Sequence, residues 1–412
     1  MSDDFEQQWL SDLPSDWTEK RADFLCSPRR VTVDPEVYGD DLVAHYSIPQ
    51  VQETGGPIIE PASDIDSAKL LVEEPTLLVS KLNPRKKTIC IAVQHSEHPT
   101  LASGEFVAIN SDQMDRCYAY YLWCSEKVTD RLSAIVQSAT RSHQRVNPAY
   151  ILKLPWKWPP LEVQRQIARF LDEKTAQIDG LIEMKRELLD RLAEKRQALI
   201  TQAVTKGLNP NAPMKPSGID WLGDIPAHWV VLRLRYAVTN LNNMRVPIAA
   251  ELRKGIERMY PYYGASGIID YVDEYIFDFP TVLVAEDGAN LLSRSTPLSF
   301  VAEGKYWVNN HAHVLRPEKM TVWFCSSLLA LYPLDPWISG SAQPKLTKEN
   351  LGSLEVWVPP LDEQRQIEAS VKQEAAHLQQ AGQPLENSIE ALEEYRSALI
   401  TAAVTGQLTE LR

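Results

Sequence analysis

The sequence lacks the features of several common protein classes. Its five cysteines form no CxxC pair, so neither a disulfide framework nor a cysteine zinc site is indicated. No apolar run approaches the roughly 18 residues that a membrane helix needs. The start of the chain, MSDDFEQQWL, is acidic and lacks the basic start and apolar core of a signal peptide. These absences predict a reduced, cytoplasmic protein that has no contact with a membrane.

An excess of positive charge is also missing. The net charge is -13, and such a charge taken alone argues against contact with nucleic-acid phosphates. The acid is unevenly spread, because residues 1–158 carry -7 and residues 359–412 carry -5, whereas residues 159–208 carry +1. Any surface that binds DNA must therefore be a local patch, or a partner must complete it.

Motifs for catalysis are absent as well. The chain has no phosphate loop of the GxxxxGK[ST] type and no cluster of spaced acids with a lysine that indicates a nuclease. NPAY (147–150) differs from the Asn-Pro-Pro-Tyr tetrad of adenine methyltransferases at its third letter, and no Gly-x-Gly loop follows a strand near it. His311 and His313 would share one strand face, but no further metal ligand is near them in the sequence. We therefore expect a chain that is not an enzyme and binds neither a cofactor nor a metal.

An internal repeat dominates what is present. Residues 159–208 and 359–408 share 19 identities in 50 positions without a gap. PPLEVQRQI opens the first copy and PPLDEQRQI the second, while ALITQAVT and ALITAAVT lie near their ends. Shorter echoes flank them, namely WLSDLPSDW (9–17) with WLGDIPAHW (221–229), and PTLLVSKLN (75–83) with PTVLVAEDGAN (280–290). The chain thus alternates a globular region with a long segment, twice.

Both long segments are predicted to be helices. Isoleucine and leucine recur in them at spacings of three, four or seven, which indicates an apolar stripe on one helix face. The glycine and prolines of KGLNPNAPMKPSG (206–218) end the first helix. In the second copy, Gly382 and Pro384 stand inside the pattern and predict a kink or break.

The two stripes predict an antiparallel helix pair. A helix of about 45 residues is roughly 65–70 Å long at about 1.5 Å per residue, and its stripe must be covered. The other copy offers a matching seam. The alternative is that each helix packs only on its own globular region, but the shared period and the length favour pairing.

The globular regions are predicted to be mixed α/β domains. LLVSKL, TICIAV, EFVAIN, TVLVAE, LSFVAE and HVLRP are typical of strands, and residues 116–136 and 318–333 are typical of helices. The predicted order is a first domain at 1–158, a helix at 159–208, a linker at 209–220, a second domain at 221–358 and a helix at 359–412. The expected fold class is α+β, with two α/β domains and an antiparallel coiled-coil spacer in a pseudo-twofold repeat.

In this order the motifs resemble the DNA-specificity subunit of type I restriction–modification systems. Besides the repeated helix segments, the resemblance rests on SKLNPR (80–85), YPYYGASGIIDYVDEYIFD (260–278), VLVAEDGANL (282–291) and SGSAQPKLTKENL (339–351). It covers nearly the whole chain. Two departures are SATRSHQR (138–145), where the second domain has GSAQPKL, and Val163, where the second copy has Glu363.

The resemblance implies both a fold and a function. The family has two target-recognition domains held apart by two antiparallel helices, and each domain reads one half of a bipartite target in double-stranded DNA. It also implies partners, namely two modification subunits, which carry S-adenosylmethionine and methylate adenine, and restriction subunits that join them. The chain itself would be non-catalytic and would help to defend the cell against foreign DNA.

Candidate DNA contacts follow from loops rich in cations and amides, because Arg, Lys, Asn and Gln bind phosphates and base edges. Solvated turns are the alternative for the cationic loops, and core packing is the alternative for the tyrosines, while Glu286 and Asp287 are expected to be structural. The candidates in the first domain are Lys81, Asn83, Arg85, Lys86, Lys87, Arg141, His143, Gln144 and Arg145. Those in the second domain are Tyr262, Tyr263, Ser266, Asn290, Arg294, Ser341, Gln343 and Lys345.

Two other functional classes stay open. A scaffold protein with a coiled-coil spacer that does not bind DNA would explain the helices but not the two similar domains. A stand-alone DNA methyltransferase would require NPAY to act as a catalytic motif. DNA binding in the presence of partners would separate a DNA reader from a scaffold, and methylation by the isolated chain would indicate an enzyme.

Overall fold

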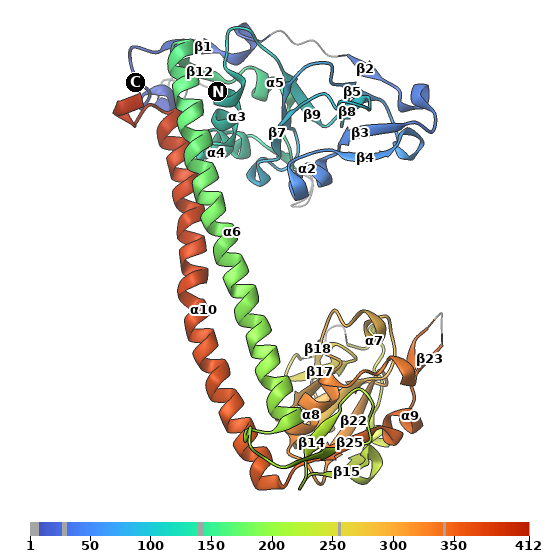
Figure 1. Ribbon diagram of the computed structural model, residues 1–412. Coiled ribbons are helices and arrows are strands. Elements are labelled where there is room, and N and C mark those ends of the chain that lie inside the picture. The colour runs from blue at the N-terminus through green and yellow to red at the C-terminus, as the bar shows by residue number, and fades with distance from the viewer. Residues whose placement is uncertain (1–7, 27–30, 139–143, 254–256, 341–342, 412) are drawn as a thin grey trace. The chain divides into compact units, whose positions relative to one another are not determined.

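The structure, a computed structural model, describes residues 8–26, 31–138, 144–253, 257–340 and 343–411. It divides into two compact units (Figure 1). Unit 1 comprises residues 1–186 and 386–412, and unit 2 comprises residues 187–385. Each unit contains both sheets and helices, as the α+β prediction requires.

Unit 1 is built around two sheets. The five-stranded sheet has the order β2-β5-β8-β3-β4, and the three-stranded sheet has the order β7-β6-β9. Their strands are β2 (Thr32–Val33), β3 (Leu42–Tyr46), β4 (Ile58–Pro61), β5 (Lys69–Leu71), β6 (Thr76–Ser80), β7 (Ile89–Ala92), β8 (Thr100–Ala102) and β9 (Phe106–Ile109). The helices are α2 (Ile48–Thr54), α3 (Arg116–Cys124), α4 (Glu126–Ala134) and α5 (Pro148–Leu152). Two antiparallel strand pairs complete the unit, β1 (Thr18–Arg21) with β12 (Pro155–Trp158), and β10 (Gln137–Ser138) with β11 (Gln144–Arg145).

Unit 2 follows the same plan with different lengths. A four-stranded sheet has the order β16-β22-β19-β20, and a three-stranded sheet has the order β18-β17-β21. Their strands are β16 (Val238–Asn240), β17 (Tyr260–Gly264), β18 (Gly267–Val272), β19 (Thr281–Ala285), β20 (Ser299–Ala302), β21 (Trp307–Val308) and β22 (Ala312–Pro317). The helices are α7 (Asn290–Ser293), α8 (Val322–Leu331) and α9 (Lys348–Ser353). The paired short strands are β13 (Met214–Pro216) with β14 (Asp224–Pro226), β15 (Val230–Arg233) with β25 (Glu355–Val358), and β23 (Ile338–Ser339) with β24 (Lys345–Leu346).

Two long helices belong to both units. Helix α6 runs without interruption over Leu161–Lys206, and helix α10 over Leu361–Val404 (Figure 1). A kink or break was expected at Gly382 and Pro384; the break is wrong, because α10 continues through both residues, while the kink stays a prediction. Proline removes one backbone donor, which α10 tolerates, and Gly382 faces α6, since a Cβ there would lie in ordinary van der Waals contact, 3.4 Å from Leu189 Cδ2.

Within each unit the two helices pack against one another. In unit 1, Ile178 and Ile182 of α6 share a hydrophobic core with Leu399 and Ile400 of α10. In unit 2, a second core joins Ala203 and Val204 of α6 to Ile367 and Val371 of α10. The start of one helix therefore meets the end of the other in each unit, as the antiparallel pairing predicted.

The repeated PPLxxQRQI motif fastens the start of each helix to its unit. The Gln164 side chain donates to the Pro159 carbonyl oxygen at 2.9 Å, and its Oε1 accepts from the Asp115 backbone N–H at 2.9 Å. Gln364 makes the matching pair of bonds with Pro359, at 2.7 Å, and Thr321, at 2.7 Å. Both amides are buried, and Asp115 and Thr321 are the N-cap residues of α3 and α8. This Gln clip fixes the direction in which each long helix leaves its unit.

The repeated ALITxAVT motif fastens the helix ends. The Trp357 indole N–H donates to the Val204 carbonyl oxygen at 2.6 Å in unit 2. In unit 1, Tyr118 Oη donates to the Val404 carbonyl oxygen at 3.1 Å, and the Trp156 indole N–H donates to Tyr118 Oη. Carbonyl groups at helix ends lack partners inside the helix, so these side chains satisfy them.

Candidate nucleic-acid interface

In unit 1, two loops meet at the end of the central strand β6. The Asn83 N–H donates to the Gln144 carbonyl oxygen at 2.9 Å, and the Val146 N–H donates to the Lys81 carbonyl oxygen at 2.8 Å. A third backbone bond, from the Lys81 N–H to the Glu105 carbonyl oxygen at 2.9 Å, fixes the first loop to the residue just before β9. We name residues 81–83 and 144–146 the unit 1 clamp. It joins the two segments of unit 1 that were predicted to contact DNA.

Unit 2 contains the same arrangement at the end of β19. The Gly288 N–H donates to the Pro344 carbonyl oxygen at 3.1 Å, and the Leu346 N–H donates to the Glu286 carbonyl oxygen at 2.8 Å. The Glu286 N–H in turn donates to the His311 carbonyl oxygen at 2.9 Å. Residues 286–288 and 344–346 are the unit 2 clamp. Residues 144–146 therefore take the place of residues 344–346, although the letters of the two segments differ.

Exposed cations surround the unit 1 clamp. The side chain of Arg85 is 71% exposed and lies 3.8 Å from Asp130, while Lys86 is also exposed. Arg145 projects from the clamp and pairs with Glu105 at 3.0 Å. Gln144 and Asn83 are half-buried. These groups can reach an anion at the clamp, because surface pairs of this kind exchange partners at little cost.

Two other cations of this loop are used inside unit 1. Lys81 is buried, and its ammonium donates to the Gly104 carbonyl oxygen. Lys87 pairs with Glu126 at 2.6 Å and donates to Ser397 Oγ of α10 at 3.2 Å. The Lys87 and Ser397 hydrogen bonds hold the pKa of Glu126 below its usual value. Lys87 thus ties the loop to the long helix.

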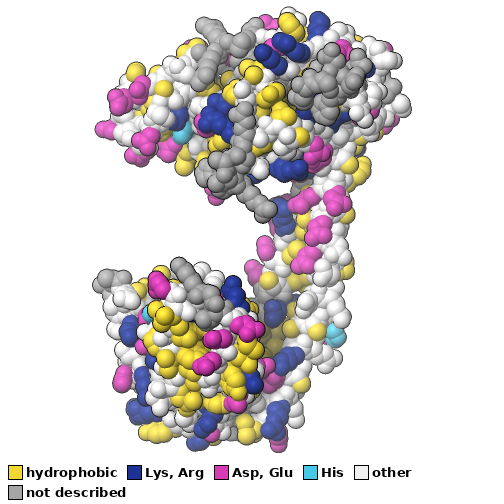
Figure 2. All heavy atoms as spheres, turned by 180° about the vertical axis from the view of Figure 1, so that it is seen from behind, with side chains coloured by type: hydrophobic (Ala, Val, Ile, Leu, Met, Phe, Trp, Pro, Cys, Tyr) yellow, Lys and Arg dark blue, Asp and Glu magenta, His cyan; other side chains and the backbone are white. Residues whose placement is uncertain are grey.

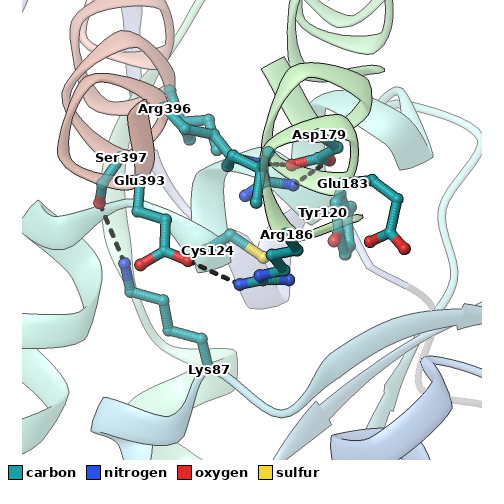
Figure 3. Close-up of a pocket in the computed structure, with 11 residues that line it drawn as sticks. Lys87, Tyr120, Cys124, Asp179, Glu183, Arg186, Glu393, Arg396 and Ser397 are labelled. Carbon is teal, nitrogen blue, oxygen red and sulfur yellow. Dashed lines mark hydrogen bonds and ion pairs between the residues drawn. The ribbon is translucent and has the colours of Figure 1, made fainter. Parts of the chain in front are cut away.

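Figure 3 shows the cavity that surrounds Lys87 in unit 1. It has a volume of about 480 Å³ and lies between α3 and the two long helices. Its charged walls pair with one another, since Arg186 contacts Glu393 at 2.9 Å and Arg396 contacts Asp179 at 2.8 Å. The cavity therefore presents balanced charge, which does not select an anion such as phosphate.

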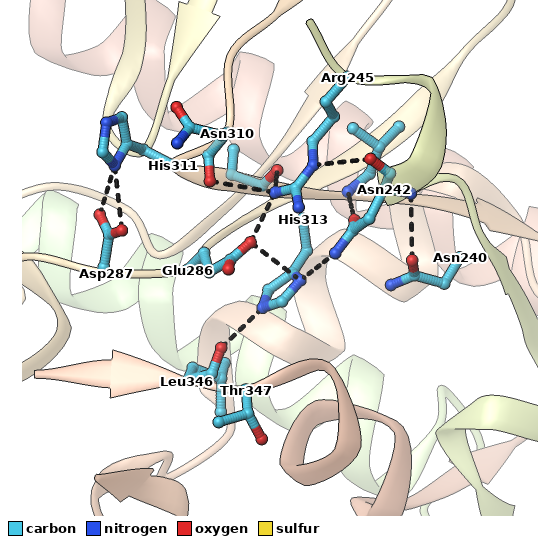
Figure 4. Close-up of polar contacts among 12 residues, drawn as sticks. Asn240, Asn242, Arg245, Glu286, Asp287, Asn310, His311, His313, Leu346 and Thr347 are labelled. Atoms are coloured by element: carbon cyan, nitrogen blue, oxygen red, sulfur yellow. Dashed lines mark hydrogen bonds and ion pairs between the residues drawn. The ribbon is translucent and has the colours of Figure 1, made fainter. Parts of the chain in front are cut away.

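A largely buried polar network contacts both segments of the unit 2 clamp (Figure 4). Arg245 Nη1 lies 2.5 Å from Glu286 Oε2 and donates to the Ala312 carbonyl oxygen at 2.7 Å. Burial raises the pKa of Glu286, but the hydrogen bond and the positive charge of Arg245, together with the hydrogen bond from Lys345, outweigh it, so the pKa lies below its usual value. Glu286 is therefore a carboxylate at neutral pH and anchors three basic groups.

His313 connects this network to the clamp. Its Nε2 lies 2.8 Å from the Leu346 carbonyl oxygen, which can only accept, so Nε2 carries the proton. Nδ1 then accepts from the Asn242 amide at 2.8 Å. Burial lowers the pKa of His313, and the bond to Leu346 offsets only part of that effect. A neutral His313 thus fixes the backbone of the clamp.

Three side chains reach solvent at the unit 2 clamp. Lys345 is half-exposed and lies 3.3 Å from Glu286, and Gln343 is exposed. His311 is also half-exposed, and its Nδ1 lies 2.8 Å from Asp287 Oδ1. Donors of these kinds suit phosphate and base-edge contacts. Lys345 and Gln343 were predicted to contact DNA, whereas His311 was not.

Several predicted DNA contacts are engaged elsewhere in unit 2. Tyr262 is buried and accepts from the Ile248 N–H at 3.0 Å, and Tyr263 packs against Phe300. Asn290 and Arg294 close the loop after β19, where Arg294 donates to the Tyr332 carbonyl oxygen at 3.0 Å. Ser266 is exposed in the turn between β17 and β18. Arg141, His143 and Ser341 lie outside the described residues.

The network residues Asn242 and Arg245 were missed in the sequence. They follow β16 in the stretch NLNNMR (240–245), which matches no motif. The three asparagines before Arg245 could have indicated this network, since asparagine side chains form hydrogen bonds with the backbone of turns. Glu286 and Asp287, which were expected to be structural, are largely buried and paired.

No helix in the described ranges has the length and apolar character that crossing a membrane requires. Within the same ranges, His, Cys, Asp and Glu side chains form no cluster of three that could hold a metal ion. All five cysteines are free thiols.

Comparison with known proteins identifies relatives of the chain. Residues 226–380 match the model of the type I restriction modification DNA specificity domain. A protein of Haemophilus influenzae named as a type I restriction enzyme specificity subunit is 38% identical over 128 residues, which are 31% of this chain and 32% of that protein. A Methanocaldococcus jannaschii protein named as the MjaX specificity subunit is 22% identical over 389 residues, which are 90% of this chain and 89% of that protein.

The fold also has a solved counterpart. A chain from a structure that describes complex assembly and conformational transition of the type I R-M system has a TM-score of 0.69. The match covers 96% of this chain and 99% of that one at 17% sequence identity. The α+β architecture of two domains and long helices is thus confirmed by a structural neighbour, and the predicted resemblance is confirmed by sequence.

Proposed function

This chain is a relative of the DNA-specificity subunits of type I restriction–modification systems, and from that premise we propose that each unit reads one half of a bipartite target in double-stranded DNA. The repeated clamp carries the proposal. Both units place two loops at the end of their central strand with the same backbone bonds, but surround them with different side chains. A fixed frame with variable donors suits two readers of different sequence.

The unit 1 clamp would supply Arg85, Lys86, Gln144 and Arg145, and the unit 2 clamp would supply Lys345, Gln343 and His311. The helices α6 and α10 would join the readers and set the spacing between the two half-sites. The chain would be non-catalytic, because its relatives are named as specificity subunits rather than as enzymes. It would bind no cofactor of its own.

The reaction would then come from partners. Two modification subunits would carry S-adenosylmethionine and methylate adenine within the target, and restriction subunits would join them. The net charge of -13 supports this division, because an acidic reader repels DNA over most of its surface and gains from partners that add positive charge.

Equilibrium DNA binding tests the proposal. The isolated chain should bind its target weakly, and the chain with its modification subunit should bind tightly, specifically and with a strong salt dependence. Tight, specific binding by the chain alone that the partner left unchanged would overturn the dependence on partners. Absence of specific binding by the complete complex would overturn the proposed function.

Substitutions at the clamps locate the contacts. Lys345→Ala in unit 2 should relax or weaken recognition of one half-site, and Arg85→Ala in unit 1 should act on the other half-site. A base contact is worth about 1–3 kcal/mol of discrimination, whereas loss of a phosphate contact lowers the salt slope by about 1. Arg316→Ala, at the far end of β22 from the clamp, is the matched control and should change neither. Methylation-site mapping in cells gives the readout.

A further inference from the structure

A third chain segment, from the loop between β21 and β22, lies against the unit 2 clamp. The His311 carbonyl oxygen accepts from the Glu286 N–H at 2.9 Å, and the His311 N–H donates to Asn309 Oδ1 at 2.8 Å. Asn309 is buried, and β22 begins at the residue after His311. The backbone of His311 is therefore fixed on both sides of its side chain.

Asp287 orients the side chain of His311. The Nδ1 atom of His311 lies 2.8 Å from Asp287 Oδ1 and 3.0 Å from Asp287 Oδ2, as the two dashed lines between them in Figure 4 show. The Asp287 side chain is only 16% exposed, and the Asp287 backbone pairs with Lys345 across the clamp. A carboxylate has no proton to donate, so Nδ1 carries the proton of this hydrogen bond.

The other ring nitrogen of His311 is available to a ligand. The side chain is 49% exposed, and Nε2 has no hydrogen-bond partner among the residues that the structure describes. In a neutral imidazole one nitrogen donates and the other accepts, so a proton on Nδ1 makes Nε2 an acceptor. His313 has the reverse arrangement, because its Nε2 donates to the Leu346 carbonyl oxygen. Unit 2 thus places an oriented hydrogen-bond acceptor beside its clamp.

This acceptor complements the other groups that reach solvent at the clamp. The ammonium of Lys345 only donates, whereas the amide of Gln343 both donates and accepts. Figure 2 shows acidic and basic side chains interspersed on the face of unit 2 that it presents, and contacts to phosphate carry no sequence information in any case. Phosphate oxygens accept hydrogen bonds, so a neutral His311 gains none from them, although a protonated His311 would.

The bases offer what the phosphates lack. In the major groove, the exocyclic amino groups of adenine N6 and cytosine N4 are the donors, whereas guanine O6 and thymine O4 are acceptors. An acceptor on the protein therefore favours adenine or cytosine at the base that it faces. Guanine or thymine there would oppose two acceptors and leave both without a proton.

We propose that neutral His311 reads the exocyclic amino group of one adenine or cytosine in the half-site of unit 2. Asp287 is the positioning residue, because it keeps the proton on Nδ1 and so keeps Nε2 an acceptor. The proposal rests on the proposed function, since it requires the unit 2 clamp to face DNA bases. It adds the chemical group that is read and the polarity of the hydrogen bond.

Base analogues test the proposal in the complete complex with the modification subunit. The mapped target duplex is prepared with each adenine in turn replaced by purine, which lacks the N6 amino group, and each cytosine by pyrimidin-2-one, which lacks the N4 amino group. Binding is measured at pH 8, where imidazole groups are mostly neutral. The wild-type complex should lose affinity roughly three- to tenfold at the base that His311 reads, which is the range of one neutral hydrogen bond. The analogue that acts there tells adenine from cytosine.

Two variants assign this loss to the pair. His311→Ala should bind the natural and the modified duplex equally at that one position and keep the wild-type response elsewhere. Asp287→Asn should have the same effect, because an amide in place of the carboxylate can hold a histidine in the wrong tautomer while the geometry persists. His228→Ala is the matched control, since His228 is likewise half-exposed and lies 2.7 Å from Glu363, away from the clamp. It should respond to every analogue as the wild type does.

The outcomes separate this inference from the proposed function. Specific binding in which His311→Ala keeps the wild-type response at every position would overturn the inference and leave the proposed function standing. An equal loss of affinity for all duplexes, with a lower salt slope, would assign His311 to phosphate and also overturn the inference. An unchanged response of Asp287→Asn would refute the positioning role. Absence of specific binding by the wild-type complex would refute the proposed function itself.

Discussion

The two clamps share their backbone bonds but reverse their charge. Lys81 in unit 1 and Glu286 in unit 2 occupy the same place, since each donates its N–H to the residue just before β9 or β22 and accepts from the second loop. Lys81 buries its ammonium against a carbonyl oxygen, whereas Glu286 binds the buried guanidinium of Arg245. Asn83 and Gly288 also match, with φ of 45° and 103° at the turn. The frame of the site is thus independent of the side chains that it presents.

Replacing residues 1–158 by the first domain of another family member should have the largest effect on the DNA sequence that is recognised. If the frame is shared and each unit reads alone, one half of the DNA target should change completely. The other half and the spacer between them should persist. Methylation-site mapping in cells with the cognate modification subunit gives the answer. A swap that altered both half-sites would show that the units do not read independently.

Removing the buried charge of unit 2 should have the next largest effect. Glu286→Gln leaves the Arg245 guanidinium without its carboxylate in a largely buried position, and breaking such a pair costs about 3–5 kcal/mol. Urea unfolding should report this loss in unit 2. Glu318→Gln removes the partner of Arg316 in an exposed pair and should change stability little. Equal effects of the two substitutions would mean that the network does not hold the clamp.

The Gln clips test whether the two units share their attachment to the helices. Gln164→Leu and Gln364→Leu should each cost about 1–3 kcal/mol, because each leaves a buried carbonyl oxygen and N–H without partners. The two losses should be similar. Gln166→Leu and Gln366→Leu change exposed positions of the same motif and serve as controls. A clear difference between Gln164→Leu and Gln364→Leu would show that the units are fastened differently.

The smallest predicted effect is a pH dependence that belongs to unit 2. The pKa of His313 is lowered by burial, so below pH 6.5 the unfolded chain takes up a proton that the folded chain refuses. Stability should therefore fall as the pH drops below 6.5, and the lowered pKa of Glu286 adds a second loss below pH 4.5.

His313→Gln should flatten the melting-temperature profile between pH 8 and pH 5. A residual slope should remain, because burial also lowers the pKa of His45 in unit 1. His45→Gln is the matched comparison and should remove that remaining part. An unchanged profile for His313→Gln would place the titration elsewhere.

The long helices and their pairing could be predicted because apolar residues recur in the sequence at the spacing of one helix face. The strands of both domains were predictable for a similar reason. The break at Pro384 was predicted wrongly, since one missing N–H costs less than the loss of the seam with Leu189 and Leu192.

The candidate site was predictable only in part. The loop at Lys81 and the loop at Gln144 were proposed as contacts, but their union was not, because backbone hydrogen bonds leave no signature in side-chain letters. For the same reason SATRSHQR was taken as a departure from GSAQPKL. Arg245 lies 41 residues from Glu286, and pairs at such separation are invisible in a single sequence.

Helix α6 starts in unit 1 and ends in unit 2, whereas helix α10 starts in unit 2 and ends in unit 1. Just after the end of α10, Gly406 packs so closely on Pro14 and Trp17 that a Cβ would lie 2.6 Å from Pro14 Cγ. Residues from the first and the last part of the described chain thus pack together in unit 1. A circular permutant that began in unit 2 and joined these two parts of the chain in unit 1 would therefore encode the same contacts. The order of the two units in the sequence would then not be required for the contacts within the folded molecule.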